Sequence, residues 1–131
     1  MRKYRTVGVA LFAAVAVVSG SGVANASAGW NYVGAGDFSN RDVDNGLWFT
    51  DYVQSSGGSF RTCLANKSET YTYTLWEHDS SNSRKIASKS SKGGCLVFNG
   101  IDDYVDGGNN KAELMLSTTN PEGGDGVAFY D

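Results

Sequence analysis

Short apolar segments alternate with clusters of Gly, Ser, Asn and Asp from residue 27 to residue 131. Such spacing is typical of an all-β protein, because turn residues end each strand after a few positions. The pattern predicts strands at Trp30–Val33, Leu47–Val53, Ser59–Ala65, Thr70–Glu77, Lys85–Lys89, Cys95–Asn99, Ile101–Val105, Ala112–Ser117 and Val127–Tyr130. We therefore expect a small antiparallel sandwich of two sheets with about seven to nine short strands.

The clearest strand signal is the segment TYTYTLWE, residues 70–77. Alternation would place Tyr71, Tyr73 and Leu75 on one face and Thr72, Thr74 and Trp76 on the other. The polar segment HDSSNS follows at residues 78–83, so residues 70–89 are expected to form a hairpin.

The first 26 residues follow a different pattern. Arg2, Lys3 and Arg5 precede twelve uncharged, mostly apolar residues at positions 7–18, and Ala24-Asn25-Ala26 follows. A basic start, an apolar segment and small residues in that order predict a secretory signal peptide, and twelve apolar residues are too few to cross a bilayer. Cleavage is expected after Ala26, or after Ala28 as the alternative, which leaves residues 27–131 as one secreted domain.

Net charge limits the classes of partner. Eight of the 11 basic residues and all 14 acidic residues lie after Ala26, so the net charge of that part is −6. This balance argues against nucleic acid or an anionic membrane surface as a partner. One basic cluster stands out: Arg84, Lys85, Lys89 and Lys92. We interpret these basic residues as charges that keep an edge strand from pairing with another chain, rather than as a site for an anionic wall polymer.

Cys63 and Cys95 are the only cysteines, and an even pair in an exported chain predicts one disulfide. Because the two residues lie on separate predicted strands, we expect the bond to join the two sheets through the core. His78 is the only histidine, which excludes a metal site built from several histidines. No metal and no cofactor is predicted.

Candidates for catalysis are weak. His78 lacks an obvious partner to orient it, so we expect a solvated loop residue. Glu77 and Asp79 would suit a glycosidase only if the strand continued through the following loop. The segment 102–110 is rich in Asp and Asn, but its spacing departs from a calcium-binding loop, and we favour turns in which these side chains cap their own backbone. No catalytic residue is predicted.

Aromatic residues offer a different kind of site. Aromatic rings can stack on sugar rings while their polar tips stay hydrated. Trp48 and Tyr52 are the best candidates, because a spacing of four residues on one strand places two side chains on the same face. The other candidates are Trp30, Trp76, Tyr71, Tyr73 and Tyr104.

Three segments carry a resemblance to a known group: FRTCLAN at 60–66, TYTYTLWEHD at 70–79 and GGCLVFNGIDDYVDGGNNKAELML at 93–116. Over residues 46–131 the chain resembles small secreted proteins of Gram-positive actinobacteria. The resemblance implies secretion and a single disulfide, and it carries no implication about activity. A crystallin-like signature has its nearest match at Tyr71 and Trp76, with His78 where that signature requires Gly.

These observations predict a secreted, non-catalytic domain that acts by surface contact, with cell-wall or environmental polysaccharide as its partner. The alternative is an inhibitor or toxin directed at another extracellular protein, which would use a rigid loop such as His78 to Arg84. A glycoside hydrolase is the third hypothesis. Exposed aromatic side chains distinguish the first hypothesis from the second.

Overall fold

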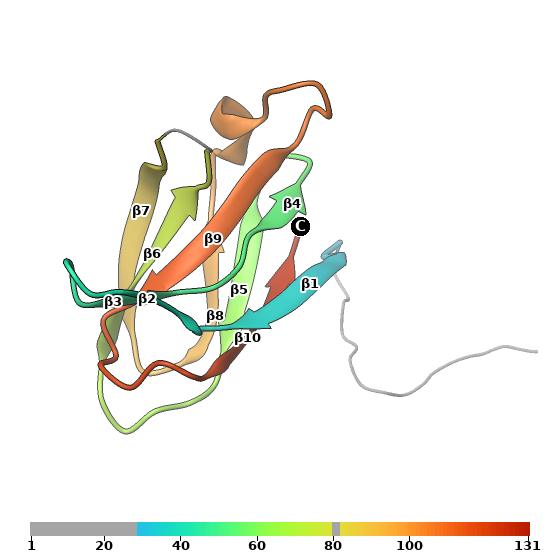
Figure 1. Ribbon diagram of the computed structural model, residues 1–131. Helices are drawn as coiled ribbons and strands as arrows, with labels where there is room; N and C mark the ends of the chain where they lie inside the picture. The colour runs from blue at the N-terminus through green and yellow to red at the C-terminus, as the bar shows by residue number, and fades with distance from the viewer. Residues whose placement is uncertain (1–28, 80–81) are drawn as a thin grey trace, which may run out of the picture. The chain divides into compact units, whose positions relative to one another are not determined.

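A computed structural model describes residues 29–79 and 82–131 (Figure 1). The predicted signal peptide, residues 1–26 with the cleavage site at Ala24 and Ala26, lies outside the described residues. Residues 31–131 form one compact unit, which is described below. Its described residues form ten strands in two sheets and one short 3₁₀ helix, which confirms the all-β prediction.

The smaller sheet has four antiparallel strands in the order β1-β10-β5-β8. Their bounds are β1 Tyr32–Asp37, β10 Gly126–Tyr130, β5 Phe60–Leu64 and β8 Gly94–Phe98. The larger sheet has six strands in the order β2-β3-β9-β6-β7, with β4 paired to β9 beside β3. Its strands are β2 Asn40–Asp42, β3 Leu47–Phe49, β4 Val53–Ser55, β6 Tyr71–Glu77, β7 Arg84–Ser91 and β9 Ala112–Thr118.

The core lies between the inner faces of the two sheets. Alternate residues of β9 are fully buried, as are Phe60 of β5 and Phe129 of β10, whose rings stack with centroids 5.7 Å apart. Tyr73 and Leu75 point into this core, as the alternation of residues 70–77 predicted. Burial of these apolar side chains is the main force that holds the sheets together.

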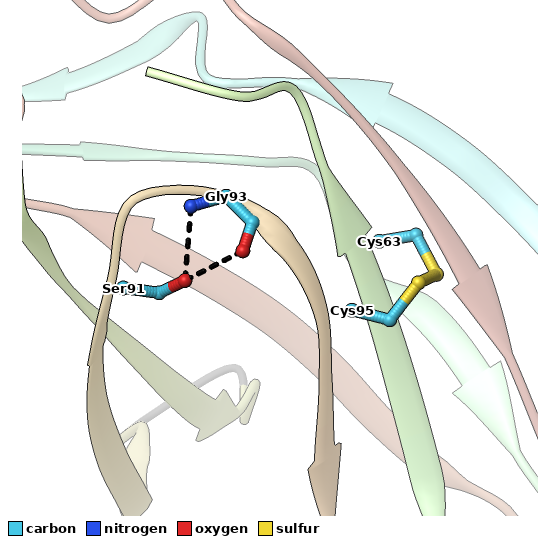
Figure 2. Close-up of a disulfide and its surroundings, with 4 residues drawn as sticks. All are labelled: Cys63, Ser91, Gly93 and Cys95. Atoms are coloured by element: carbon cyan, nitrogen blue, oxygen red, sulfur yellow. Dashed lines mark hydrogen bonds between the residues drawn. A yellow bond between two sulfur atoms is a disulfide. The ribbon is translucent and has the colours of Figure 1, made fainter. Parts of the chain in front are cut away.

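The disulfide between Cys63 and Cys95 is confirmed, with sulfurs 2.05 Å apart (Figure 2). Its expected position was wrong. The two cysteines are direct cross-strand partners on β5 and β8 of the four-stranded sheet. Cys63 points outward because its strand neighbours Thr62 and Leu64 point inward and are buried. The bond therefore joins two strands of one sheet on its outer face and does not cross the core.

The chain passes from the six-stranded sheet to the four-stranded sheet by a tight turn between β7 and β8 (Figure 2). The Ser91 hydroxyl accepts a hydrogen bond from the Gly93 amide at 2.9 Å and donates one to the Gly93 carbonyl at 2.7 Å. Gly93 has φ of 128°, and a Cβ there would lie 2.6 Å from the carbonyl oxygen of Ala65. Only glycine fits this turn.

Two predicted strands differ from the structure. Residues 101–105 were predicted as a strand, but Ile101–Tyr104 form the 3₁₀ helix η2. The left-handed Gly100, at φ 77°, turns the chain there, and the Asp102 carboxylate accepts a hydrogen bond from the Gly58 amide. The predicted strand Leu47–Val53 is broken into β3 and β4. With β2, which was not predicted, these changes give ten strands rather than seven to nine.

The basic cluster lies along an edge strand, as predicted. β7 is the last strand of the six-stranded sheet and carries Arg84, Lys85 and Lys89, and Lys92 follows it directly. Charged residues on an exposed edge oppose pairing with a further strand. Within the described part of the chain, no helix is long and apolar enough to cross a membrane.

Candidate surface-binding site

The break between β3 and β4 decides where the predicted aromatic pair points. Phe49 pairs with Ser117 and Val53 pairs with Leu114, so three residues of one strand oppose two of the other. Such a β-bulge shifts the inward and outward alternation by one position. Trp48 faces inward, because it pairs with the buried Thr118 before the bulge. Tyr52 faces outward, because its neighbour Val53 pairs with the buried Leu114 after the bulge. The expectation that the two rings share a face was wrong, because it assumed an unbroken strand.

Trp48 packs at the margin of the core. Its indole N–H donates a hydrogen bond of 3.0 Å to the Pro121 carbonyl, and the Arg41 guanidinium lies 5.3 Å from the ring centroid. Gly123 also lies against the ring: a Cβ there would be 2.5 Å from the nearest indole atom. These contacts assign Trp48 a structural role in holding the loop before β10.

Tyr52 is the exposed aromatic residue of this region. Its side chain is 49 % exposed, and its ring stacks on the His78 imidazole with centroids 4.7 Å apart and planes 9° apart. The backbone of His78 is tied to β9, since its N–H donates a hydrogen bond of 2.6 Å to the Glu113 carbonyl. His78 was predicted to be a solvated loop residue, but it is half-buried and supports the Tyr52 ring.

A first groove, with a volume of about 520 Å³, lies on one side of this ring pair. Its apolar lining residues include Phe49 and Met115 on the outer face of the six-stranded sheet, and the ring centroids of Phe49 and Trp76 are 5.8 Å apart. Polar groups also line the groove: the Asn40 amide donates a hydrogen bond of 2.9 Å to the Asp51 carboxylate. The other lining residues are Arg41, Asp42, Thr50 and Ser83.

A second groove, of about 400 Å³, lies on the other side of the pair and also has Tyr52 and His78 in its wall. It is more polar, because its remaining lining residues are Gln54, Glu77, Asp79, Asp106, Asn109 and Glu113. The Asn109 amide donates a hydrogen bond of 3.1 Å to the Glu113 carboxylate. The two grooves thus meet at one stacked ring pair.

Glu77 is the buried acid beside the second groove. Its side chain is 3 % exposed and accepts hydrogen bonds from Arg84, at 2.9 Å from Nε. This contact raises the pKa of the Arg84 guanidinium above its ordinary value. The Arg84 guanidinium also lies 4.9 Å from the centroid of the Tyr104 ring. The Glu77 carboxylate thus anchors the edge strand β7, a role distinct from that of a glycosidase acid paired with Asp79.

The Asp- and Asn-rich segment 102–110 uses its side chains for turns. Asp102 accepts from the Gly58 amide at 2.9 Å, and the Asn109 side chain accepts from the backbone amide of Lys111 at 3.1 Å. The latter contact spans two residues, as in an Asx turn. Across residues 29–79 and 82–131, no group of three or more His, Cys, Asp or Glu side chains is arranged to hold a metal ion.

Comparison with known proteins places the chain in a family. The family model described as "YndA coiled coil domain" matches residues 32–129. The uncharacterized protein YndA of Bacillus subtilis (strain 168) is 31 % identical over 102 residues, which cover 75 % of this chain and 76 % of that protein. The chain belongs to the YndA family.

The family description mentions a coiled coil, but the matched segment folds differently in this member. The described residues between 32 and 129 form strands and the short helix η2, with no α-helix among them. A coiled coil requires long helices with an apolar heptad repeat. The word in the family's description therefore does not apply to the fold of this chain.

Sequence reasoning identified Tyr52 but missed its surroundings. Phe49, Met115 and the supporting role of His78 were not predicted, because the bulge that turns Phe49 and Tyr52 outward leaves no clear mark in the sequence. One sequence pattern pointed to this surface: the alternation in residues 70–77 placed Trp76 on the outer face of its strand, with Tyr73 on the core face. The Trp76 indole N–H indeed lies on the outer face and donates to the Ser117 hydroxyl at 2.9 Å.

Proposed function

We propose that residues 27–131 form a secreted, non-catalytic domain that binds cell-wall or environmental polysaccharide by surface contact. The observation that carries the proposal is the Tyr52 ring, half exposed and held flat against His78 between two grooves. A ring that is already fixed loses little conformational entropy when a ligand stacks on it.

The polar groups beside the ring support the same partner. Sugars present hydroxyl groups around an apolar ring face, so a binding site combines an aromatic surface with hydrogen-bonding side chains. Asn40 and Asp51 supply such groups on one side of Tyr52, and Gln54 and Asn109 supply them on the other. All four side chains are exposed and within reach of a bound ligand.

Secretion is part of the proposal. It is supported by the basic, apolar and small-residue pattern of residues 1–26, by the resemblance to secreted actinobacterial proteins, and by the disulfide, which forms and persists in oxidising compartments. The intact mass of protein collected from the culture medium tests it. We expect a chain beginning at Ser27 or Gly29, and a membrane-retained chain that still carries residues 1–26 would contradict it.

Retention on insoluble glycans tests binding. Wild-type protein is incubated with cellulose, chitin, xylan and purified cell wall, and the bound fraction is compared with that of Tyr52→Ala. Tyr32→Ala is the matched control, because Tyr32 is 61 % exposed but lies on the four-stranded sheet against Tyr130. We expect Tyr52→Ala to abolish retention at unchanged melting temperature and Tyr32→Ala to retain it. Equal retention by wild type and Tyr52→Ala would contradict the proposal.

A further inference from the structure

We infer that this site binds the interior of a linear, uncharged polysaccharide, with sugar residues in both grooves and one stacked on Tyr52. The inference rests on the proposed function and adds the class of ligand and the way it lies. It is carried by the position of the Tyr52 and His78 ring pair, which forms part of the wall of both grooves.

The two grooves follow one direction along the six-stranded sheet. Met115 lines the first groove and Glu113 lines the second, two positions along the same strand β9. Phe49, in the first groove, is opposite Ser117, and Gln54, in the second, is opposite Glu113. The site therefore extends from Glu113 to Ser117, four steps along β9, or about 13 Å at roughly 3.3 Å per residue. That length exceeds a single sugar ring and suits a chain of linked rings.

Each groove has one buried lining residue, Thr50 or Glu77, and its other lining residues are exposed or half-buried. Asn40 and Asp51 of the first groove are exposed, and so are Gln54, Asp106 and Asn109 of the second. A ligand that fills both grooves can therefore continue past them at either end. A site of this form suits the middle of a polymer, whereas recognition of a chain end requires a wall that stops the chain.

The charges around the grooves select against acidic polymers. Asp42 and Asp51 line the first groove, and Asp106 and Glu113 line the second. Arg41 also lines the first groove, where the two carboxylates outnumber its one positive charge, and Arg84 beside the second groove is paired with Glu77. Carboxylates accept hydrogen bonds from sugar hydroxyls but repel other carboxylates and phosphates. The preferred ligand is therefore an uncharged, hydroxyl-rich chain.

Calorimetric titration with neutral oligosaccharides tests the inference. The probes are β-1,4-linked glucose and N-acetylglucosamine oligosaccharides of two and six residues, with polygalacturonate as the acidic polymer. Asn40→Ala changes only the first groove and Gln54→Ala only the second. Ser90→Ala, an exposed position on β7 outside both grooves, is the control. All variants are first compared with wild type by melting temperature.

For one of the two hexasaccharides, we expect Asn40→Ala and Gln54→Ala each to weaken binding about 3- to 10-fold, as for the loss of one hydrogen bond. The matching disaccharide should bind more weakly than the hexasaccharide and respond to at most one of the two substitutions. Polygalacturonate should not bind, and Ser90→Ala should behave as wild type.

Three results would overturn the inference while leaving polysaccharide binding intact: equal affinity for disaccharide and hexasaccharide, sensitivity of the hexasaccharide to only one groove, or tighter binding of polygalacturonate. In each case, loss of binding by Tyr52→Ala would show that the proposed function still holds. If wild-type protein binds no glycan, or if Tyr52→Ala binds as wild type does, the proposed function fails as well.

Discussion

The Tyr52 ring lies flat on the His78 imidazole, with centroids 4.7 Å apart and planes only 9° apart. The two residues come from separate parts of the sheet: Tyr52 from the bulge between β3 and β4, and His78 from the position directly after β6. The hydrogen bond from the His78 amide to the Glu113 carbonyl ties the backbone below the supporting ring to β9. The stack thereby supports an exposed tyrosine on the outer face of the sheet.

Replacement of His78 tests this support. His78→Ala removes the ring beneath Tyr52 and leaves the Tyr52 side chain free to rotate, so ordering it again on binding has an entropic cost of about 1 kcal/mol. We expect retention on the polysaccharide to fall severalfold at unchanged melting temperature. His78→Phe keeps a flat ring and should restore most of the retention. Wild-type retention by His78→Ala would show that the stack is not needed.

Trp48 and Tyr52 are expected to respond in opposite ways to substitution. Trp48 packs at the margin of the core and donates to Pro121, so Trp48→Ala should lower the free energy of unfolding by about 2–4 kcal/mol. The folded fraction should bind polysaccharide as the wild type does. Urea denaturation and retention assays on the same preparation measure both effects. A stable Trp48→Ala variant that loses binding would place the site at Trp48 instead.

Trp48 and Tyr52 separate the features that local sequence patterns predict from those that depend on distant strand pairing. The all-β class, the hairpin of β6 and β7 and the pairing of the cysteines follow from local patterns, since turn residues, alternation and cysteine number act at short range. The outward direction of the Tyr52 side chain does not follow from local patterns. It depends on how residues 50–52 pair with β9, more than 60 residues away in the sequence. A one-residue shift between distant strands leaves no local pattern and reverses every side chain beyond it.

The same limit explains the disulfide. Two cysteines and a predicted export signal predict a bond, but which strands become neighbours is set by the topology of the sheet. Residues Cys63 and Cys95 proved to be opposite each other on adjacent strands of one sheet. The site's second groove was likewise beyond local reasoning, because it draws residues from β4, β9 and the segments after β6 and η2.

Removal of the disulfide should destabilise the domain without changing its fold. The bond closes a sequence separation of 32 residues, which corresponds to about 3–4 kcal/mol on the chain-entropy account. β5 and β8 remain paired by backbone hydrogen bonds, so the double variant Cys63→Ala/Cys95→Ala should keep its circular dichroism spectrum and unfold at lower urea concentration. An unchanged free energy of unfolding would contradict this expectation.

Asp42 gives the turn between β2 and β3 a dependence on pH. A hydrogen bond from the Asn45 side chain, at 2.8 Å, holds the pKa of the Asp42 carboxyl below its ordinary value, and the amides of Asn45 and Asp44 assist. A lowered pKa means that the folded state favours the ionised form. The contribution to stability is therefore complete above the unfolded pKa, near 4, and is lost as the pH falls through the folded value.

An NMR titration of the Asp42 carboxyl carbon measures this effect. Asn45→Ala removes the largest cause of the shift, so the Asp42 pKa should rise toward that of an unstructured aspartate. An Asp42 pKa that is the same with and without Asn45 would contradict the assigned cause.

The proposed site is tested most directly by the residues that a bound glycan contacts. Amide chemical shifts of isotope-labelled protein, followed during titration with the uncharged hexasaccharide that binds best, would map that contact. We expect the changes to gather at Asn40, Tyr52, Gln54 and His78, on the outer face of the six-stranded sheet. Changes centred on Tyr32 and Tyr130 of the four-stranded sheet, or along the lysines of β7, would contradict it.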